Sequence, residues 1–143
     1  PVFFDLDFGF KSATRDMLGK FFNPKGEASP DQSRTYFEIY IGLRKNAAWR
    51  DYCVERYVEV VETYFNSERA TALLDEMTAA LRPEMQRQID KWNRPYSMED
   101  WEESIAELRE IVAQRPEYAL ANLQDYFNVS QEKMDELIAK YSK

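Results

Sequence analysis

The sequence predicts a mainly α-helical fold, an irregular bundle of about six helices with one short N-terminal strand. Apolar residues recur at steps of three and four from residue 33 to residue 141, which is the period of one helix face. The hydrophobic content of 44%, with only 4 Gly and 6 Pro, excludes a disordered chain. Only residues 2–8 form a short aromatic and β-branched run, as a strand does. A length of 143 residues suits one domain, so we expect a single helical domain over residues 1–143.

Residues 1–10 are expected to hold the strand, and residues 11–32 form a loop region. The residues that can line one side of a short helix within this loop region are Met17, Leu18, Phe21 and Phe22. One strand cannot form a sheet, so its partners must come from outside this chain or from a second copy. Helices then fill residues 33–141. The first should end near Lys45-Asn46, where Asn can cap the next helix.

The longest helix is predicted after Asn46, because apolar and aromatic residues recur there on one broad face. The members of this face, which we expect to be buried, are Trp49, Tyr52, Cys53, Arg56, Tyr57, Val60, Val61, Tyr64 and Phe65. Ser67 is expected to cap the following helix. The apolar stripe of that helix consists of Ala70, Leu73, Leu74, Met77 and Leu81.

Prolines and capping residues divide the rest of the chain. Pro83 and Pro116 each follow an arginine and are expected to end or reset a helix, although Arg115 could also bind a carboxylate inside the fold. Residues 93–96 predict a break, after which Ser97 begins a helix and Ser130 a last one. The stripes of these helices consist of Trp101, Ile105, Leu108 and Val112, then of Met134, Leu137, Ile138 and Tyr141. Short connections favour antiparallel neighbours.

Composition excludes several classes of function. The net charge of -7 repels phosphate backbones and anionic lipid, so nucleic acid is not expected as a partner. No apolar run reaches the roughly 20 residues of a membrane helix. The chain has no histidine, which excludes a histidine base, histidine-ligated zinc and a histidine pH switch within it. Chemistry in this chain must therefore use carboxylates, Lys, Arg, Tyr or a bound cation.

Two further observations concern processing and redox state. Cys53 is the only cysteine, so the chain cannot form an internal disulfide, and its place in a helical stripe favours a buried, inert thiol over a nucleophile. The chain begins with Pro1 and lacks the basic start and cleavage site of a signal peptide. We therefore expect that the natural start has been removed.

The segment with chemical character is Asp5-Leu6-Asp7-Phe8-Gly9-Phe10. Residues two apart on a strand share a face, so Asp5 and Asp7 can offer oxygen atoms to one hard divalent cation. Asp7-Phe8-Gly9 spells the motif whose Asp binds Mg²⁺ in protein kinases. The alternatives are a solvated strand end and an exposed edge whose charges discourage strand pairing.

Other charged and aromatic groups favour a structural role. An acidic first turn follows Ser97 and suits the helix dipole without a ligand. Its acidic residues are Glu99, Asp100, Glu102 and Glu103. Trp49, Trp92 and Trp101 sit at helical spacing and are expected in the core or at its rim rather than in a ligand cage.

A series of short words runs along the chain in a fixed order after Asp5-Leu6-Asp7-Phe8-Gly9-Phe10. These words are Leu43-Arg44-Lys45-Asn46, Trp49-Arg50, Arg56-Tyr57, Tyr64-Phe65-Asn66, Leu73-Leu74-Asp75-Glu76-Met77, Arg82-Pro83-Glu84-Met85, Lys91-Trp92, Trp101, Leu108-Arg109, Arg115-Pro116 and Leu123-Gln124-Asp125-Tyr126-Phe127. The ordered series resembles the C-terminal part of the CotH kinase family, named for spore coat protein H. The resemblance spans residues 4–127.

The resemblance implies the helical C-lobe of an atypical protein kinase, in which Asp5 and Asp7 bind Mg²⁺ or another divalent cation. Which of the two is the direct ligand stays open. The intact protein would transfer phosphate from ATP to Ser or Thr of a protein. The nucleotide-binding part, its basic residues and the acidic catalytic residue are expected upstream of Pro1. The resemblance therefore implies no catalytic residue within this chain, and we expect the chain alone to be inactive.

Partners and location follow from the same resemblance. The implied partners are the nucleotide-binding part of the same protein and a protein substrate, which the sequence does not name. The implied location is the bacterial spore coat or the cell surface, including secretion. The alternatives are a non-catalytic helical interaction or scaffold module of a surface or coat protein, and a dimer that forms through the N-terminal strand.

Overall fold

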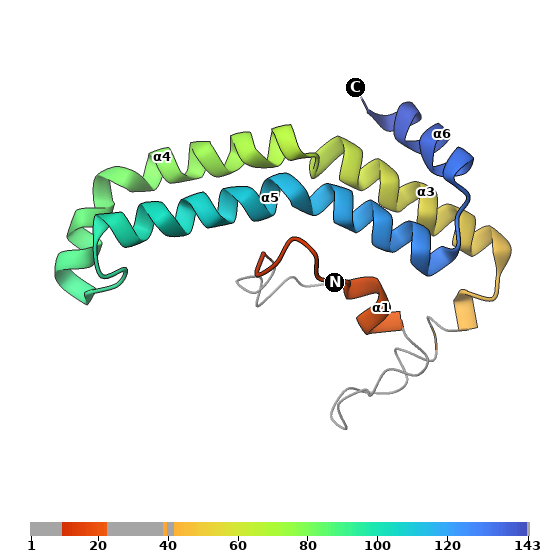
Figure 1. Ribbon diagram of the computed structural model, residues 1–143, viewed down its shortest axis with the longest axis horizontal. Helices are drawn as coiled ribbons and strands as arrows, with labels where there is room; N and C mark the ends of the chain where they lie inside the picture. Colours follow the sequence, from red (N-terminus) through yellow and green to blue (C-terminus); the bar gives the residue numbers. More distant parts are fainter. Residues whose placement is uncertain (1–9, 23–38, 40–41, 143) are drawn as a thin grey trace. The chain divides into compact units, whose positions relative to one another are not determined.

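The computed structural model describes residues 10–22, 39 and 42–142. Over these residues the regular structure is helical and comprises five helices (Figure 1). They are α1 (Met17–Phe22), α3 (Ala47–Tyr64), α4 (Ser67–Trp92), α5 (Met98–Phe127) and α6 (Gln131–Tyr141). The mainly helical fold is confirmed. The predicted strand, through which a dimer was one alternative, lies outside the described residues, as does most of the helix predicted before Lys45.

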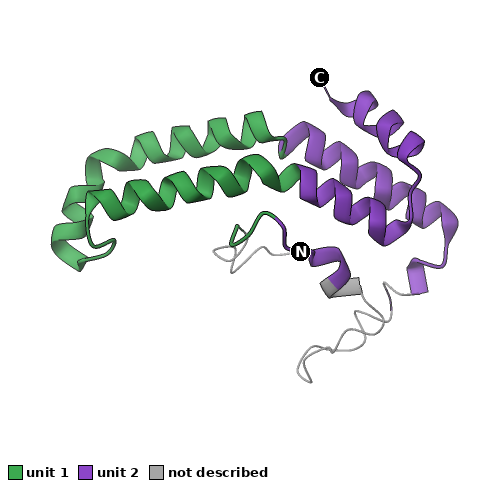
Figure 2. Ribbon diagram, viewed as in Figure 1, with its two compact units in different colours: residues 1–13, 65–116 green, residues 14–64, 117–143 purple. Residues whose placement is uncertain are grey.

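The chain divides into two compact units (Figure 2). The first comprises residues 1–13 and 65–116, and the second residues 14–64 and 117–143. Helix α5 contributes to both units, because the division falls after Pro116. The single domain expected from the sequence stays a prediction.

The core of the second unit is a cluster of apolar side chains from α3, α5 and α6. Val58, Leu123 and Met134 are less than 2% exposed, and Val54 and Leu137 complete the cluster. The partly buried side chains that pack against it are Leu18, Tyr57, Leu120, Phe127, Val129, Ile138 and Tyr141. Burial of each large side chain of this kind contributes roughly 1.5–3 kcal/mol, so this cluster is the main reason that the three helices associate.

Side-chain caps fix several helix starts where the sequence predicts them. Asn46 Oδ1 accepts a hydrogen bond of 3.1 Å from Trp49 N ahead of α3. Ser97 Oγ accepts one of 3.0 Å from Asp100 N at α5, and Ser130 Oγ accepts one of 3.3 Å from Lys133 N at α6. One expected cap is wrong: Asn66, not Ser67, precedes α4 and accepts a hydrogen bond of 2.9 Å from Arg69 N. Asn and Ser are both favoured at the N-cap, so the sequence alone does not decide between these adjacent residues, and the structure has Asn66 in this position.

The first unit is built on an antiparallel pair of helices, α4 and the first part of α5. Asp75 of α4 pairs with Arg109 of α5, and Arg82 pairs with Glu102, so later residues of α4 meet earlier residues of α5. Residues 93–97 form the connection. Asn93 ends α4 in the left-handed conformation, with its N–H donating to Ile89 O at 2.7 Å. The expected break and the antiparallel pairing are confirmed.

The helix boundaries expected at Pro83 and Pro116 are wrong. Pro83 lies inside the 26 residues of α4, and Pro116 lies inside the 30 residues of α5. An interior proline costs about 3 kcal/mol because it removes one N–H donor and crowds the preceding turn. Burial on both sides of each proline offsets this cost: Thr78 and Ile89 flank Pro83, and Val112 and Ala119 flank Pro116. The prediction of about six helices is therefore not confirmed.

The buried faces of α3 and α4 also differ from the expected ones. In α3 the buried residues are Val54, Val58 and Val61, of which the sequence predicted only Val61. The expected Tyr52 and Tyr64, and Phe65 just after the helix, are 66%, 49% and 54% exposed. Valine fits closely against a neighbouring helix, while tyrosine can leave its hydroxyl in water. In α4 the expected Leu73, Met77 and Leu81 are between 53% and 56% exposed.

Helix α6 is joined to α3 by polar contacts at the rim of the second unit's core. Lys140 Nζ and the Tyr141 hydroxyl both donate to Glu55 Oε1, the latter at 2.8 Å. Ser142 Oγ donates to Glu62 Oε2 at 2.7 Å. The hydrogen bond from Lys140 holds the pKa of Glu55 below its ordinary value of 4.5, and the Tyr141 hydroxyl lowers it further. The bond to Glu55 raises the pKa of Lys140 above its ordinary value of 10.5.

Core burial predicts unequal effects for two leucines. Leu123→Ala should destabilise the chain by about 2–5 kcal/mol, because Leu123 is 1% exposed and its removal leaves a cavity. Leu73→Ala, at a position that is 55% exposed, should change the free energy of unfolding by about 0.5 kcal/mol or less. Urea unfolding followed by circular dichroism measures both. Equal destabilisation by the two substitutions would contradict the assigned core.

The Glu55 cluster predicts a pH dependence of stability. Because the folded chain lowers the pKa of Glu55, its contribution is fully present above about pH 4.5 and is lost as the pH falls through the lower folded value. Glu55→Gln should therefore lower the urea midpoint near neutral pH and have a smaller effect at about pH 3, below the ordinary pKa of the carboxyl group. The matched control is Glu136→Gln, whose ion pair with Lys133 stays within α6. A Glu55→Gln effect that is the same at both pH values would disprove the role of its charge.

Candidate functional site

The predicted metal ligands Asp5 and Asp7 lie outside the described residues. Their grouping stays a prediction from the sequence. Within the part of the chain that the structure describes, no three His, Cys, Asp or Glu side chains are grouped so that they could hold a metal ion. Over the same residues, no helix combines the length and the apolar character that a bilayer span requires.

The structure does describe the chain that directly follows the acidic motif. Phe10 is 45% exposed, whereas Ala13 is only 8% exposed. Arg115 Nη1 of α5 donates a hydrogen bond of 2.8 Å to Ala13 O, across 102 positions of sequence. This partly buried contact attaches the segment after the motif to α5 within the first unit. The sequence suggested helix punctuation or a carboxylate partner for Arg115, and neither suggestion identified a backbone carbonyl.

A second fixed point follows at α1. Asp16 Oδ1 accepts a hydrogen bond of 2.8 Å from Gly19 N and so caps the first turn of this short helix. A Cβ atom at position 19 would meet the Asp16 carboxylate, so a larger residue there would require this side chain to shift from its present position. Leu18 packs against the core of the second unit. The short helix expected around Met17 is therefore confirmed, and it packs against the core of the second unit through Leu18.

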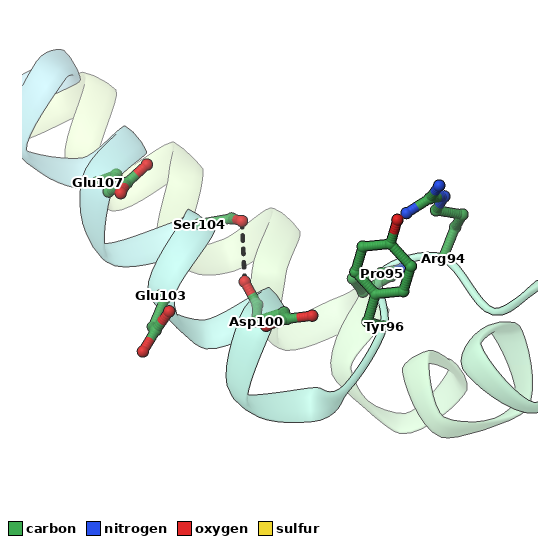
Figure 3. A pocket seen from close by; sticks show the side chains of 7 residues that line it. All are labelled: Arg94, Pro95, Tyr96, Asp100, Glu103, Ser104 and Glu107. Atoms are coloured by element: carbon green, nitrogen blue, oxygen red, sulfur yellow. Dashed lines mark hydrogen bonds between the residues drawn. The ribbon is translucent and has the colours of Figure 1, made fainter.

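A hollow of about 370 Å³ lies where α4 connects to α5 (Figure 3). Its lining residues are Arg94, Pro95, Tyr96, Asp100, Glu103, Ser104 and Glu107. The Arg94 guanidinium lies 4.0 Å from the centre of the Tyr96 ring. Figure 3 shows the carboxylates of Asp100, Glu103 and Glu107 pointing in different directions along α5 rather than toward one point. Their spacing is that of a solvated helix face, and we assign no ligand to it.

Residues from separate segments of the family resemblance are in contact within each unit. In the second unit, Arg44 Nη2 donates to Tyr126 O at 2.7 Å, and its guanidinium lies 4.2 Å from the Tyr126 ring centre. The rings of Trp49 and Phe127 lie 6.4 Å apart. In the first unit, Asp75 pairs with Arg109, and the Arg82 guanidinium lies 5.1 Å from the Trp101 ring centre. In the first unit these residues join α4 to α5, and in the second they join α3 and the turn before it to α5.

Two titratable groups complete the description. Cys53 is a half-buried free thiol, and burial raises its pKa, which disfavours the reactive thiolate. Burial also raises the pKa of Tyr126, against the opposing effect of the Arg44 charge. Both shifts arise from helix packing and indicate no reaction at these residues.

Comparison with known proteins gives one finding. The model of the CotH kinase protein family matches residues 2–119, which include Asp5, Asp7 and four of the five described helices in whole or in part. No match was found among curated proteins or among solved structures. The matched range contains both the acidic motif and the paired words of the helices, and this chain belongs to the CotH kinase family.

Proposed function

We propose that this chain is the helical C-terminal part of a CotH-type protein kinase that transfers phosphate from ATP to Ser or Thr of a protein. In this proposal Asp5 and Asp7 bind the divalent cation. The observation that carries it is the family match over residues 2–119, because that match includes both carboxylates as well as the helices. A location in the spore coat or at the cell surface is part of the same proposal.

The donor chemistry of the acidic motif fits a hard cation. Mg²⁺ prefers oxygen ligands and is commonly bound by one or two carboxylates together with substrate phosphates. Asp5 and Asp7 supply two carboxylates at a spacing that places them on one face of an extended chain. Asp5 and Asp7 would hold the cation, and the chemistry that it would supply when bound is neutralisation of the charge that develops in phosphoryl transfer.

The described residues would serve this site by fixing the chain around it. Arg115 binds the backbone after the motif, and Asp16 and Leu18 seat α1 shortly beyond. We assign no nucleotide cradle and no acidic base to the residues of this chain. Because phosphoryl transfer depends on positioning both reactants, the chain alone should have no appreciable kinase activity.

A second candidate function is a non-catalytic scaffold or interaction module of a coat or surface protein. The observation in its favour is a row of apolar side chains on α4. Leu73, Met77 and Leu81 recur every four residues on one face, and each is more than half exposed. Such a row is typical of a surface that another protein covers.

Substitution of the acidic pair separates these two functions. In the intact protein, Asp5→Asn with Asp7→Asn should reduce Mg²⁺-dependent phosphorylation about a hundredfold or more, because the cation loses both charged ligands. Autophosphorylation with labelled ATP measures the activity, and equilibrium dialysis measures Mg²⁺-dependent ATP binding. Asp51→Asn, at an exposed position of α3, is the matched control and should leave both unchanged.

The scaffold function gains if the intact protein neither binds ATP with Mg²⁺ nor phosphorylates itself. Full phosphorylation activity in the double variant would instead overturn the role of Asp5 and Asp7 as metal ligands and leave the kinase function standing.

A further inference from the structure

We infer that Arg115 is a positioning residue for the metal-binding segment, which it holds to α5 through the backbone carbonyl of Ala13. This inference rests on the proposed function, because it takes Asp5 and Asp7 as the ligands. The inference gives a role to Arg115, which lies 102 positions after Ala13 in the sequence.

The contact has the properties of a durable anchor. A charged guanidinium donates to a neutral carbonyl over 2.8 Å, and hydrogen bonds of this kind are stronger than those between two neutral groups. Ala13 is 8% exposed, so water has little access to replace the bond. Because the acceptor belongs to the main chain, the contact fixes the path of the backbone rather than the side chain at position 13.

The anchor lies close enough in sequence to restrict the motif. Ala13 follows Asp7 by six residues, and six residues span at most about 20 Å when fully extended. Fixing one end of so short a segment removes much of the conformational freedom that metal binding would otherwise have to remove. Loss of the anchor should therefore weaken metal binding without removing either ligand.

Other arginines of the same unit make a different kind of contact. Arg109 and Arg82 pair with carboxylates on the facing helix, and these ion pairs are 41–51% exposed. Both ion pairs hold α4 and α5 in register. Arg109 is therefore a matched control for Arg115, because it is the same residue type on the same helix.

The experiment measures two properties of the 143-residue chain. Mn²⁺ is the probe, with its affinity determined by electron paramagnetic resonance. Hydrogen exchange reports on the amides of residues 10–14. Arg115→Met should weaken Mn²⁺ binding about tenfold, because binding must then remove the conformational freedom that the segment regains, and it should speed exchange at these amides.

Two further variants sharpen the test. Arg109→Met should leave Mn²⁺ affinity and exchange at residues 10–14 within about twofold of the wild type. Arg115→Lys should recover part of the lost affinity, since an ammonium group can still donate to one carbonyl. Thermal unfolding shows that each variant is folded at the temperature of the binding measurement.

The outcomes are distinguishable. Unchanged exchange at residues 10–14 in Arg115→Met would overturn the anchor itself. Faster exchange with unchanged Mn²⁺ affinity, while Asp5→Asn abolishes binding, would overturn the positioning role and leave the proposed metal site intact. A wild-type chain that binds no Mn²⁺ through Asp5 and Asp7 would overturn the metal site and the positioning role together, and the exchange measurement would still decide whether Arg115 anchors the segment.

Discussion

A proline in a helix interior removes one N–H donor and costs about 3 kcal/mol, yet α5 passes through Pro116 without ending. The described part of the chain depends on this continuity. One side of Pro116 supplies Trp101 and Val112 to the first unit, and the other side supplies Leu123 to the core of the second. The residue just before the proline, Arg115, binds the segment that follows the acidic motif. A helix that ended at Pro116 would lose the side chains that each unit buries around it.

The distribution of residues that identify the family has a physical explanation. Arg44 meets Tyr126, and Asp75 meets Arg109, so residues from separate words of the sequence are partners in space. These partners are arginines, carboxylates and aromatic rings that set the register of helices whose apolar faces alone would allow sliding. In the described helices, the residues that carry the family resemblance therefore mainly make packing contacts. The residues to which we assign chemistry are Asp5 and Asp7, and they belong to the motif that precedes these helices in the sequence.

Charge has a local role on this acidic chain. The net charge of -7 sets the character of the whole surface, while individual pairs join particular helices. Arg82 with Glu102 joins α4 to α5, and Lys140 with Glu55 joins α6 to α3. Exposed ion pairs of this kind contribute little to stability and more to the choice of partner and register. Apolar burial around Val58 and Leu123 provides the larger favourable term.

The sequence by itself determined the helical class, the caps at Asn46, Ser97 and Ser130, and the break at residues 93–96. A cap depends on a side chain and an amide three residues away, so local sequence contains the whole interaction. The order of residues in the sequence likewise identified the acidic motif and indicated the family. Only the tertiary structure decided that Val54 and Val58 of α3 are buried while Tyr52 and Tyr64 are exposed, that α4 and α5 continue through their prolines, and that Arg115 reaches Ala13. Each of these outcomes depends on neighbours that are distant in sequence, and periodicity along one helix does not specify which side will be covered.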